Sequence, residues 1–418
     1  MKMKDKGNIL DLEAEVIYNG LCCYCGTCGA FCKEYISFEQ ERPVTRKKCY
    51  EIHGACYDFC PRTFFAPFEV ERAVFGAVRR DNLLGYYATE EDIFTARATD
   101  ETVRARGQDG GVVSALLGFL LERGELDAAV VSKKSEEGEG EGEGEGTGEG
   151  TGEGTGEGTG EGAGVWEAEP FVATTKEEVL AGAGSKYTQC PSVLGVGDAL
   201  ERGYKKVALV GLPCHIQGMR KVQLSRGFDV GAERVKLCVG LFCTETLEMP
   251  RLKAKLAELG TRIEEVEKFN IKKGKFIVQT QEGKELKTPI KKLRDCVREA
   301  CDYCYDFAAE FADLSVGSIG SELGWSTVIV RSEPGREAVK QAEEAGILET
   351  ARLSEEQLEA VRGLASFKKQ GNLKSIYEKA ERVRIMNLEV EPERLGKFFG
   401  VGGEKKEKKE KRGERKWR

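Results

Sequence analysis

The chain has 418 residues, of which 40% are hydrophobic and 32% are charged, and its net charge is −7. This length and composition predict two or three domains with a sizeable core, and the lack of a basic stripe argues against nucleic-acid binding. The longest apolar run, 112–121, is about half of the roughly 20 residues of a transmembrane helix, and no signal segment is recognised. We therefore expect a cytoplasmic protein without a transmembrane segment.

The N-terminal region is rich in cysteine. Residues 21–32 read LCCYCGTCGAFC, and four of these cysteines have the spacing C-x2-C-x2-C-x3-C: Cys22, Cys25, Cys28 and Cys32. Bacterial ferredoxins use this spacing to wrap thiolates around a [4Fe–4S] cluster. A zinc site would leave a redundant cysteine, and a reducing compartment disfavours a disulfide framework. We therefore favour an iron–sulfur cluster, with Cys23 as an extra cysteine that fits no ligand position.

The next cysteines in the chain are less regularly spaced: Cys49, Cys56 and Cys60, the last followed by proline. If the ferredoxin crossing holds, the first cluster has four thiolates, from Cys22, Cys25, Cys28 and Cys60. The second then has only three, from Cys32, Cys49 and Cys56, and His53 or an outside group is a candidate fourth ligand. One cluster with buried free thiols is the alternative. We predict that residues 1–70 form a ferredoxin-like iron–sulfur module.

From about residue 75 the expected strands and helices alternate, which indicates an α/β body, with α+β architecture in part as an alternative. Helices are predicted at 110–125, after the capping-box pattern that begins at Thr175, near 191–203, at 249–259 and over 354–385. Strands are predicted at 125–132, 169–175, 205–211, 235–243, 275–280, 285–290, 313–320 and 327–332. The body is expected to span 75–345.

Two segments have a composition typical of disorder. Residues 136–164 repeat Glu-Gly and then Thr-Gly-Glu-Gly without large apolar side chains, which predicts a disordered loop inserted into the body. The cost of closing such a loop grows only logarithmically with its length, so the insertion should cost little stability. Residues 403–418 are basic and are predicted to be a disordered tail after a helical C-terminal segment, 346–402.

Seven further cysteines are spread widely over the body. Cys214 and Cys243 follow predicted strands, at the sheet edge where open α/β folds bind ligands, and Cys301 and Cys304 form a C-x2-C knuckle. These four thiols could hold another cluster, but their spacing alone leaves this open. Cys238 lies inside a predicted strand and is interpreted as a core residue.

Six stretches of the body carry a family resemblance: GQDGGVVSALLGFLLERGELDAAVV (107–131), GSKYTQCPSVL (184–194), VALVGLPCHIQGMRKVQ (207–223), GLFCTE (240–245), KGKFIVQTQEG (273–283) and CDYCYDFAAEFADLSVGSIGSELGWSTVIVR (301–331). In this order they resemble the beta-subunit family of coenzyme F420-dependent hydrogenases and dehydrogenases. With a ferredoxin-like N-terminus, the chain resembles the electron-input subunit of reduced-F420 dehydrogenase complexes and the front half of F420-dependent sulfite reductases.

The resemblance implies three cofactors: FAD, a [4Fe–4S] cluster in the body, and coenzyme F420 as substrate. The family's cluster cysteines match Cys214, Cys243, Cys301 and Cys304, which brings the expected number of clusters to two or three. Two features depart from the family: His215 stands where Gln is frequent, and the Glu-Gly insertion is not a family feature. We interpret His215 as a structural histidine at a helix start, with tuning of the adjacent cluster as the alternative.

Two loops are candidates for contacts with the flavin and the coenzyme. The first consists of Gln108, Asp109, Gly110 and Gly111. It precedes a helix whose N-terminus could cradle a pyrophosphate, although it is not a G-x-G-x-x-G fingerprint and could be an ordinary helix start. The second consists of Gly184, Ser185, Lys186, Tyr187 and Thr188. It offers a cation and hydroxyls for a phosphate or for the anionic tail of F420, unless Lys186 is simply solvated. Trp325 is expected either beside a ring system or in the core.

The predicted function is that of an F420-dependent oxidoreductase subunit. It would exchange a hydride with F420 through FAD and pass single electrons through [4Fe–4S] clusters to a redox partner protein, such as a hydrogenase, dehydrogenase or reductase subunit. One alternative is a ferredoxin-driven FAD and iron–sulfur reductase of a small organic substrate that does not use F420. Another is a non-catalytic electron-transfer adaptor. Hydride transfer between two bound rings needs no acid–base pair, and no catalytic side chain is named.

Overall fold

The computed structural model describes residues 7–135 and 167–380. Its centre is a sheet of eight strands: β3 (Ile93–Ala98), β4 (Ala128–Lys134), β5 (Ala168–Ala173), β6 (Val207–Gly211), β7 (Val235–Leu241), β11 (Leu314–Gly317), β12 (Ser326–Val330) and β13 (Leu348–Arg352). Their order across the sheet is β13-β3-β12-β11-β7-β6-β4-β5. The central strands β4, β6, β7 and β11 are parallel, and the strands outside them pair antiparallel. The expected α/β class is confirmed.

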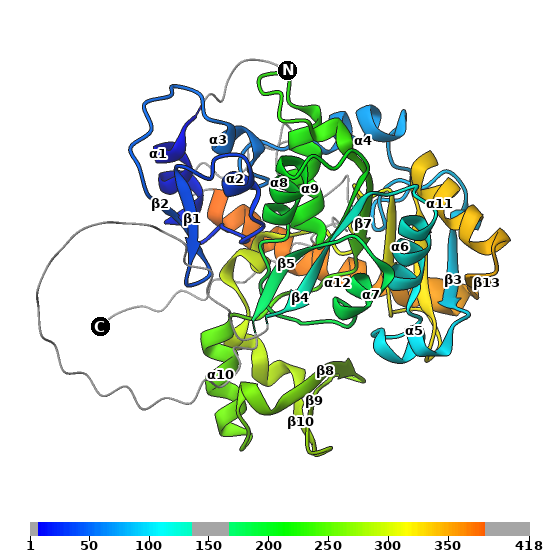
Figure 1. The fold of residues 1–418 in the computed structure, drawn as a ribbon. Helices are drawn as coiled ribbons and strands as arrows, with labels where there is room; N and C mark the ends of the chain where they lie inside the picture. Colours follow the sequence, from blue (N-terminus) through cyan, green and yellow to red (C-terminus); the bar gives the residue numbers. More distant parts are fainter. Residues whose placement is uncertain (1–6, 136–166, 381–418) are drawn as a thin grey trace, which may run out of the picture.

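Helices cover both faces of this sheet (Figure 1). One face packs against α5 (Glu101–Arg106), α6 (Val112–Glu122), α7 (Lys176–Ala181) and α11 (Glu333–Glu344). The other packs against α4 (Pro67–Phe75), α8 (Val193–Glu201) and α9 (Pro213–Leu224). Successive residues of a strand point to opposite faces, so Ala129 and Val131 enter the first core and Ala128 and Val130 the second.

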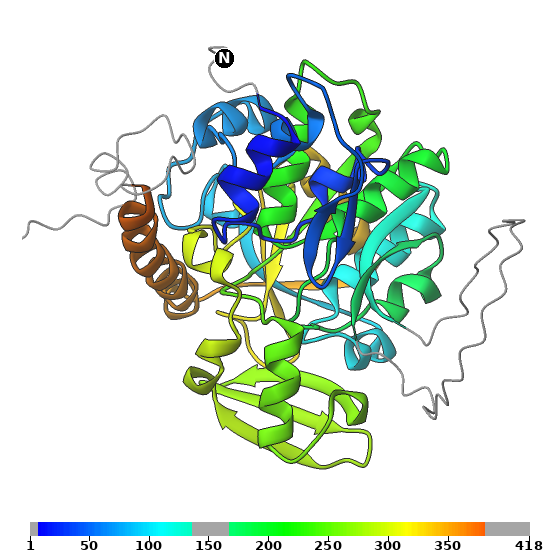
Figure 2. The same ribbon diagram turned by 90° about the vertical axis from the view of Figure 1, so that its left-hand side faces the viewer.

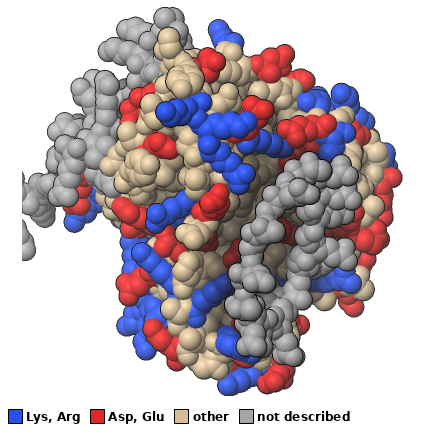
Figure 3. All heavy atoms as spheres, turned by 60° about the vertical axis from the view of Figure 1, so that its left-hand side comes forward, with Lys and Arg blue, Asp and Glu red and all other residues tan. Residues whose placement is uncertain are grey.

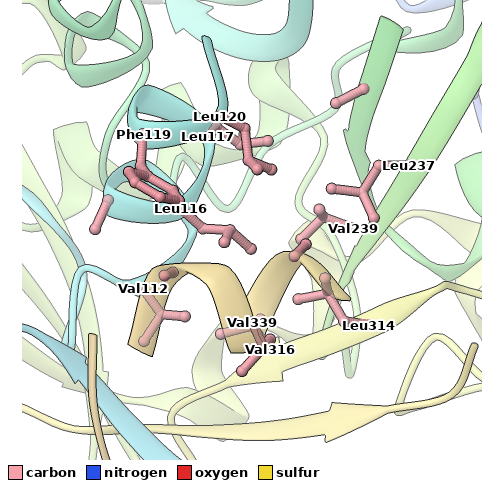
Figure 4. Close-up of a cluster of buried hydrophobic side chains, with 14 of the residues drawn as sticks. Val112, Leu116, Leu117, Phe119, Leu120, Leu237, Val239, Leu314, Val316 and Val339 are labelled. Atoms are coloured by element: carbon pink, nitrogen blue, oxygen red, sulfur yellow. The ribbon is translucent and has the colours of Figure 1, made fainter. Parts of the chain in front are cut away.

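The first core is built from long apolar side chains of α6. In Figure 4, Val112, Leu116 and Leu120 of α6 and Val339 of α11 lie opposite side chains of the central strands β7 and β11. The helix therefore buries its apolar positions on the parallel part of the sheet, which fixes the position of its N-terminus at the sheet's edge.

The N-terminal region consists of short elements: α1 (Ile9–Leu12), a π-helical turn (Glu13–Ile17), α2 (Thr27–Ala30), the hairpin β1 (Ile36–Glu39) and β2 (Arg42–Thr45), and α3 (Ala55–Phe59). It packs directly against α8 and α9 (Figures 1 and 2). The N–H of Val193 donates to the carbonyl of Cys25 (3.1 Å), and Lys221 Nζ donates to the carbonyl of Cys60 (2.7 Å). Ala30 and Phe59 share a core with the body.

A small lobe extends from the main sheet at the bottom of Figures 1 and 2. It contains α10 (Met249–Glu258), the antiparallel strands β8 (Val266–Lys272), β9 (Lys275–Thr280) and β10 (Glu285–Pro289), and a 3-10 segment (Ile290–Cys296). Its core contains Leu252, Leu256, Phe269, Phe276 and Val278.

The last described element is α12 (Glu355–Ala380), which lies along the flank of the body in Figure 2 and contacts the 3-10 segment Glu299–Tyr303. Leu373 and Ile376 pack in the same cluster as Ile9 and Leu12 of the N-terminal region. The helix thus joins the body to the cysteine-rich region.

Most predicted elements are found with small shifts of their ends, and the Thr175–Glu178 capping box is formed. The helical assignment of 346–402 is wrong at its start, because residues 348–352 form β13 and pair antiparallel with β3. The prediction missed β3, β8, α4 and α11. The predicted disordered segments 136–164 and 403–418, and the part of the predicted helical segment beyond residue 380, lie outside the described residues.

Charged side chains of both signs are interspersed over the face shown in Figure 3. Among the described residues, no helix combines the length and the apolar character needed to cross a membrane.

Candidate functional site

A cavity of about 310 Å³ opens where the parallel strands end. Ser132 of β4, Gly211 of β6, Leu241 of β7 and Val316 of β11 line it, and these strands are parallel neighbours. Their carboxyl ends therefore meet at one edge of the sheet, which is where open α/β folds bind ligands. Every predicted cofactor-binding residue lines this cavity except Gly110.

Gly111 and the amino end of α6 face the cavity, whereas Gly110 has a packing role. Gly111 has a φ of 68° and directly precedes α6, whose first turn also lines the cavity. A Cβ at Gly110 would lie 2.6 Å from the carbonyl oxygen of Ala96 and 2.8 Å from the backbone nitrogen of Ser326. Gly110 therefore allows the loop to approach β3 and β12, and the N-terminus of α6 is the kind of helix end that can bind an anion.

The two predicted loops are joined by Gln108. Its Oε1 accepts a hydrogen bond from the N–H of Ser185 (3.2 Å), and its Nε2 donates to Oδ1 of Asn270 in β8 (3.0 Å). Asp109 accepts a hydrogen bond from the Ser318 hydroxyl after β11. These polar contacts fix the cavity wall between the sheet and the lobe.

Lys186 is held by its own loop and is not a solvated lysine. Its Nζ donates to the carbonyls of Gly182 (2.6 Å), Ala183 (3.1 Å) and Gly184 (3.0 Å), and burial lowers its pKa to about 8. Tyr187 has a φ of 60°, and its ring lies edge-on to Phe276 of the lobe with the centroids 6.3 Å apart. Burial raises the pKa of Tyr187 to about 12, so its hydroxyl is neutral at physiological pH.

His215 follows Cys214 in the chain, lines the cavity and is 3% exposed. Its Nδ1 accepts a hydrogen bond from the N–H of Leu212 (3.0 Å), which assigns the proton of the neutral ring to Nε2. Burial lowers its pKa to about 4, so the ring is neutral at physiological pH. This hydrogen bond caps the N-terminus of α9, as expected of a structural histidine.

The four cysteines predicted for the first cluster are close neighbours. Burial raises the pKa of Cys60 to about 12, and burial together with the nearby Cys22 and Cys60 raises that of Cys28. The Cys25 pKa is raised by its hydrogen bond with the Cys23 thiol, by burial and by the nearby Cys60 and Cys28. The fold therefore brings together Cys22, Cys25, Cys28 and Cys60, although two runs of the chain supply them.

The second predicted set is brought together in part. The thiols of Cys32 and Cys56 share a hydrogen bond, which lowers the pKa of Cys32 to about 7. Cys49 packs against the same hydrophobic cluster. His53 Nε2 lies 3.7 Å from Oδ1 of Asp58, and its ring packs against Phe228. This placement favours a histidine in a turn over a fourth ligand.

The four body cysteines converge from three parts of the chain. Cys243 follows β7, Cys214 lies in the first turn of α9, and Cys301 and Cys304 lie in and directly after the segment Glu299–Tyr303. Burial raises the pKa of Cys243 to about 12, with Cys301 and Cys304 as its thiol neighbours, and Cys304 also lies near Cys214. Cys243 lines the cavity, so this thiol group adjoins it.

Cys23 connects two of these groups, which the sequence did not predict. Its thiol hydrogen-bonds with Cys214 of the body and with Cys25 of the N-terminal region. The side chain is buried at the contact between the two regions. In contrast, Cys238 is fully buried in the core, as predicted.

Two buried cations test whether these thiols fit an anionic iron–sulfur cluster. Arg62 is 3% exposed, lies near Cys304, Cys23 and Cys214, and its Nε has no hydrogen-bond partner among the described residues. Lys368 of α12 is 5% exposed and lies near Cys304, Cys243 and Cys301. Burying a cation without a nearby anion costs free energy of folding. Thiolates that hold an anionic cluster would balance Arg62 and Lys368, whereas neutral thiols would not.

In the described ranges no three His, Cys, Asp or Glu side chains are close enough to hold one metal ion. A four-iron cluster is larger than a single ion, and its thiolates stand further apart.

Two residues near the site were not predicted from the sequence. Thr246 donates its N–H to the Cys301 sulfur (3.4 Å), and Ser318 lines the cavity. Only the fold brings them there, so no local pattern signals them. Ser326, which follows Trp325 in a candidate loop, also lines the cavity. Trp325 lies outside the cavity lining, with its ring 4.4 Å from the Arg97 guanidinium.

Comparison with known proteins agrees with this geometry. The family models for the N-terminal and C-terminal parts of the coenzyme F420 hydrogenase/dehydrogenase beta subunit match residues 93–143 with 158–195, and residues 204–356. The chain belongs to this family. It is therefore an oxidoreductase of the F420 hydrogenase/dehydrogenase beta-subunit type, and the matched residues include both cavity loops and all four body cysteines.

Two relatives show how far the similarity extends. The coenzyme F420 hydrogenase subunit beta of Methanothermobacter thermautotrophicus is 37% identical over 64% of this chain and 86% of its own length. The coenzyme F420-dependent sulfite reductase of Methanocaldococcus jannaschii is 33% identical over 93% of this chain. The chain spans about half of that reductase (54%).

A solved structure supports the fold assignment of this F420 hydrogenase/dehydrogenase family member. A chain of the F420-reducing [NiFe] hydrogenase complex from Methanosarcina barkeri is 31% identical with a TM-score of 0.61. The alignment covers 72% of this chain and 94% of that chain.

Proposed function

We propose that this chain exchanges a hydride with coenzyme F420 through FAD bound in the cavity, and passes single electrons through iron–sulfur clusters to a redox partner protein. The observation that carries the proposal is the position of Cys243, which lines the cavity and also neighbours Cys301 and Cys304. A site for a flavin ring and a site for an electron carrier would then share one wall.

The residues of the cavity have separate tasks in this proposal. A bound flavin supplies the conversion between hydride transfer and single-electron transfer. The N–H groups at the start of α6, after Gly111, would bind its pyrophosphate. Gln108 holds the loop that carries Ser185 against the lobe, which keeps the opposite wall in place. The neutral Tyr187 and His215 add no charge beside the ring.

The thiol groups support a path that leads away from the cavity. The body group adjoins the cavity, Cys23 joins Cys214 to Cys25, and Cys32 with Cys56 lies further along the N-terminal region. Electrons would therefore leave through the N-terminal region, where the partner protein would bind. The sulfite reductase relative is about twice as long as its matched part, so it has room for a fused redox partner.

The first test is anaerobic turnover. The chain is reconstituted with iron, sulfide and FAD, and mixed with reduced F420 and a viologen dye. We expect the absorbance of oxidised F420 to return while the dye is reduced, with two dye molecules reduced per F420 because a hydride carries two electrons.

A Cys243→Ala variant separates the two halves of the reaction. It should still oxidise about one F420 per bound FAD, but its dye reduction should fall at least about tenfold because the electron carrier beside the cavity is lost. Flavin binding without any F420 oxidation would instead favour the ferredoxin-driven reductase. A chain that binds no flavin would be an electron-transfer adaptor.

A further inference from the structure

Helix α12 supplies a cation and an amide to the body thiol group, and the family models do not assign either residue. The matched family segment ends at residue 356, whereas Lys368 and Asn372 lie one helical turn apart in α12. Lys368 Nζ donates to the carbonyls of Cys243 (2.7 Å) and Asp306 (2.7 Å). Asn372 Nδ2 donates to the carbonyls of Cys301 (2.7 Å) and Cys304 (2.7 Å).

The charge of Lys368 is directed at the thiols. Its two hydrogen-bond acceptors are neutral carbonyls, and the acidic groups that face it are the thiols of Cys304, Cys243 and Cys301 and the carboxyls of Asp306 and Glu245. The adjacent Lys369 points elsewhere, to Glu310 and to the carbonyl of Asn82. Lys368 is 5% exposed, so water screens its field only weakly.

We propose that Lys368 is a positioning residue that raises the reduction potential of a cluster held by Cys214, Cys243, Cys301 and Cys304, and that Asn372 fixes the Cys301–Cys304 loop beside it. The inference rests on the proposed function, because it requires the body cluster. Reduction adds one negative charge to a cluster, and a fixed buried cation stabilises the more negative state. Its removal must therefore lower the potential of this cluster selectively.

The test is a redox titration followed by electron paramagnetic resonance, with the reconstituted full-length chain. The body cluster's signal is identified as the one that disappears in a Cys243→Ser variant. Lys368→Gln removes the charge but keeps a donor for the Cys243 carbonyl. At a fixed solution potential, we expect the reduced-to-oxidised ratio of this cluster to fall about tenfold, which is about 59 mV for a one-electron couple.

Two variants serve as controls. Lys368→Arg keeps the charge and should keep most of the potential, while Lys374→Met removes an exposed lysine (79% exposed) of the same helix and should change nothing. An unchanged potential in Lys368→Gln with full iron content would overturn the inference. So would loss of iron from Lys368→Gln when Lys368→Arg retains it, because Lys368 would then serve to retain the cluster. If instead the proposed function is wrong, the Cys243→Ser substitution will remove no signal from the spectrum of the wild-type chain.

Discussion

Gly110 shows how one residue positions the cavity without lining it. The loop that it occupies runs so close to β3 and β12 that the Gly110 N–H bonds to Ser326 Oγ (3.1 Å) and a side chain would collide with backbone atoms. The same approach places Gly111 and the start of α6 at the cavity. Stability and the proposed cofactor binding should therefore be coupled at this position.

We predict that Gly110→Ala lowers the free energy of unfolding by about 1–3 kcal/mol, because backbone must shift to admit the methyl group. FAD affinity should fall with it, since the shift moves the start of α6. Thermal unfolding and flavin titration measure both effects. Gly363→Ala is the matched control: it lies within α12 with no atom near its added Cβ, and should stabilise the chain by up to about 1 kcal/mol. Equal effects of both substitutions would contradict the steric explanation.

The cysteines show what local spacing can and cannot predict at this scale. The spacing of Cys22, Cys25 and Cys28 is a local pattern that indicates a cluster loop by itself. The role of Cys23 has no such signal, because its neighbour Cys214 is far away in the sequence and only the packing of α2 against α8 and α9 brings them together. Arg62 and Lys368 escape sequence reasoning for the same reason.

At the scale of elements, a buried charge network attaches α4 and α12 to the body. Arg79 pairs with Glu71 of α4 and with Glu310, and Glu310 pairs with Lys369 of α12, all with fully buried side chains. Arg79 and Lys369 hold the pKa of Glu310 below its usual value despite its burial. Three distant segments are therefore joined through Glu310.

Lys369→Met should lower the free energy of unfolding by about 3–5 kcal/mol, because Glu310 loses one of the two cations with which it forms ion pairs inside the protein. Lys374→Met, at an exposed position of the same helix, should change it by no more than about 0.5 kcal/mol. Chemical denaturation of both variants gives the comparison. If Lys369→Met were as stable as wild type, the network would not be what holds α12 in place.

Elements with continuous apolar runs were predictable, and most of the elements that were missed have mixed sequences. β6 and β7 are buried on both faces, so their runs of Val, Leu and Ala stand out. Charged residues interrupt the apolar residues in three strands that are partly exposed to water: β3 (IFTARA), β8 (VEKFNIK) and β13 (LETAR). The predicted helix at the start of 346–402 was wrong for this reason.

On the scale of the whole molecule, the arrangement of the thiols predicts that one cluster can be removed while another is retained. The thiols around Cys25 and those around Cys304 belong to different regions, joined at Cys23. We predict that Cys25→Ala and Cys304→Ala each remove a different part of the iron and of the cluster absorbance, while FAD stays bound.

Iron, sulfide and flavin analyses of the reconstituted variants test this prediction. Cys238→Ala is the control, because Cys238 is a fully buried core residue, and it should keep all of its iron. Loss of zinc in place of iron would contradict both cluster assignments. If Cys25→Ala kept its full iron content, the ferredoxin-like spacing would not mark a cluster.

The described residues on either side of the Glu-Gly insertion are paired, and one of them lines the cavity, which makes removal of the insertion informative. Lys134 and Ala168 are paired across β4 and β5, the N–H of Ser135 donates to the carbonyl of Glu167 (2.8 Å), and Ala168 lines the cavity. A short turn can therefore close this antiparallel pair in place of residues 136–166. The family model matches residues 93–143 and 158–195 but not residues 144–157.

We predict that this replacement leaves FAD binding and the KM for F420 unchanged. Shortening the connection from about 31 residues to about four should raise the free energy of unfolding by about 2 kcal/mol, because less chain entropy is lost on closing the loop. Denaturation and steady-state kinetics of the shortened chain measure both effects. A higher KM for F420 at unchanged FAD affinity would show that the insertion aids coenzyme binding, whereas a lower KM would show that its glutamates repel an anionic substrate.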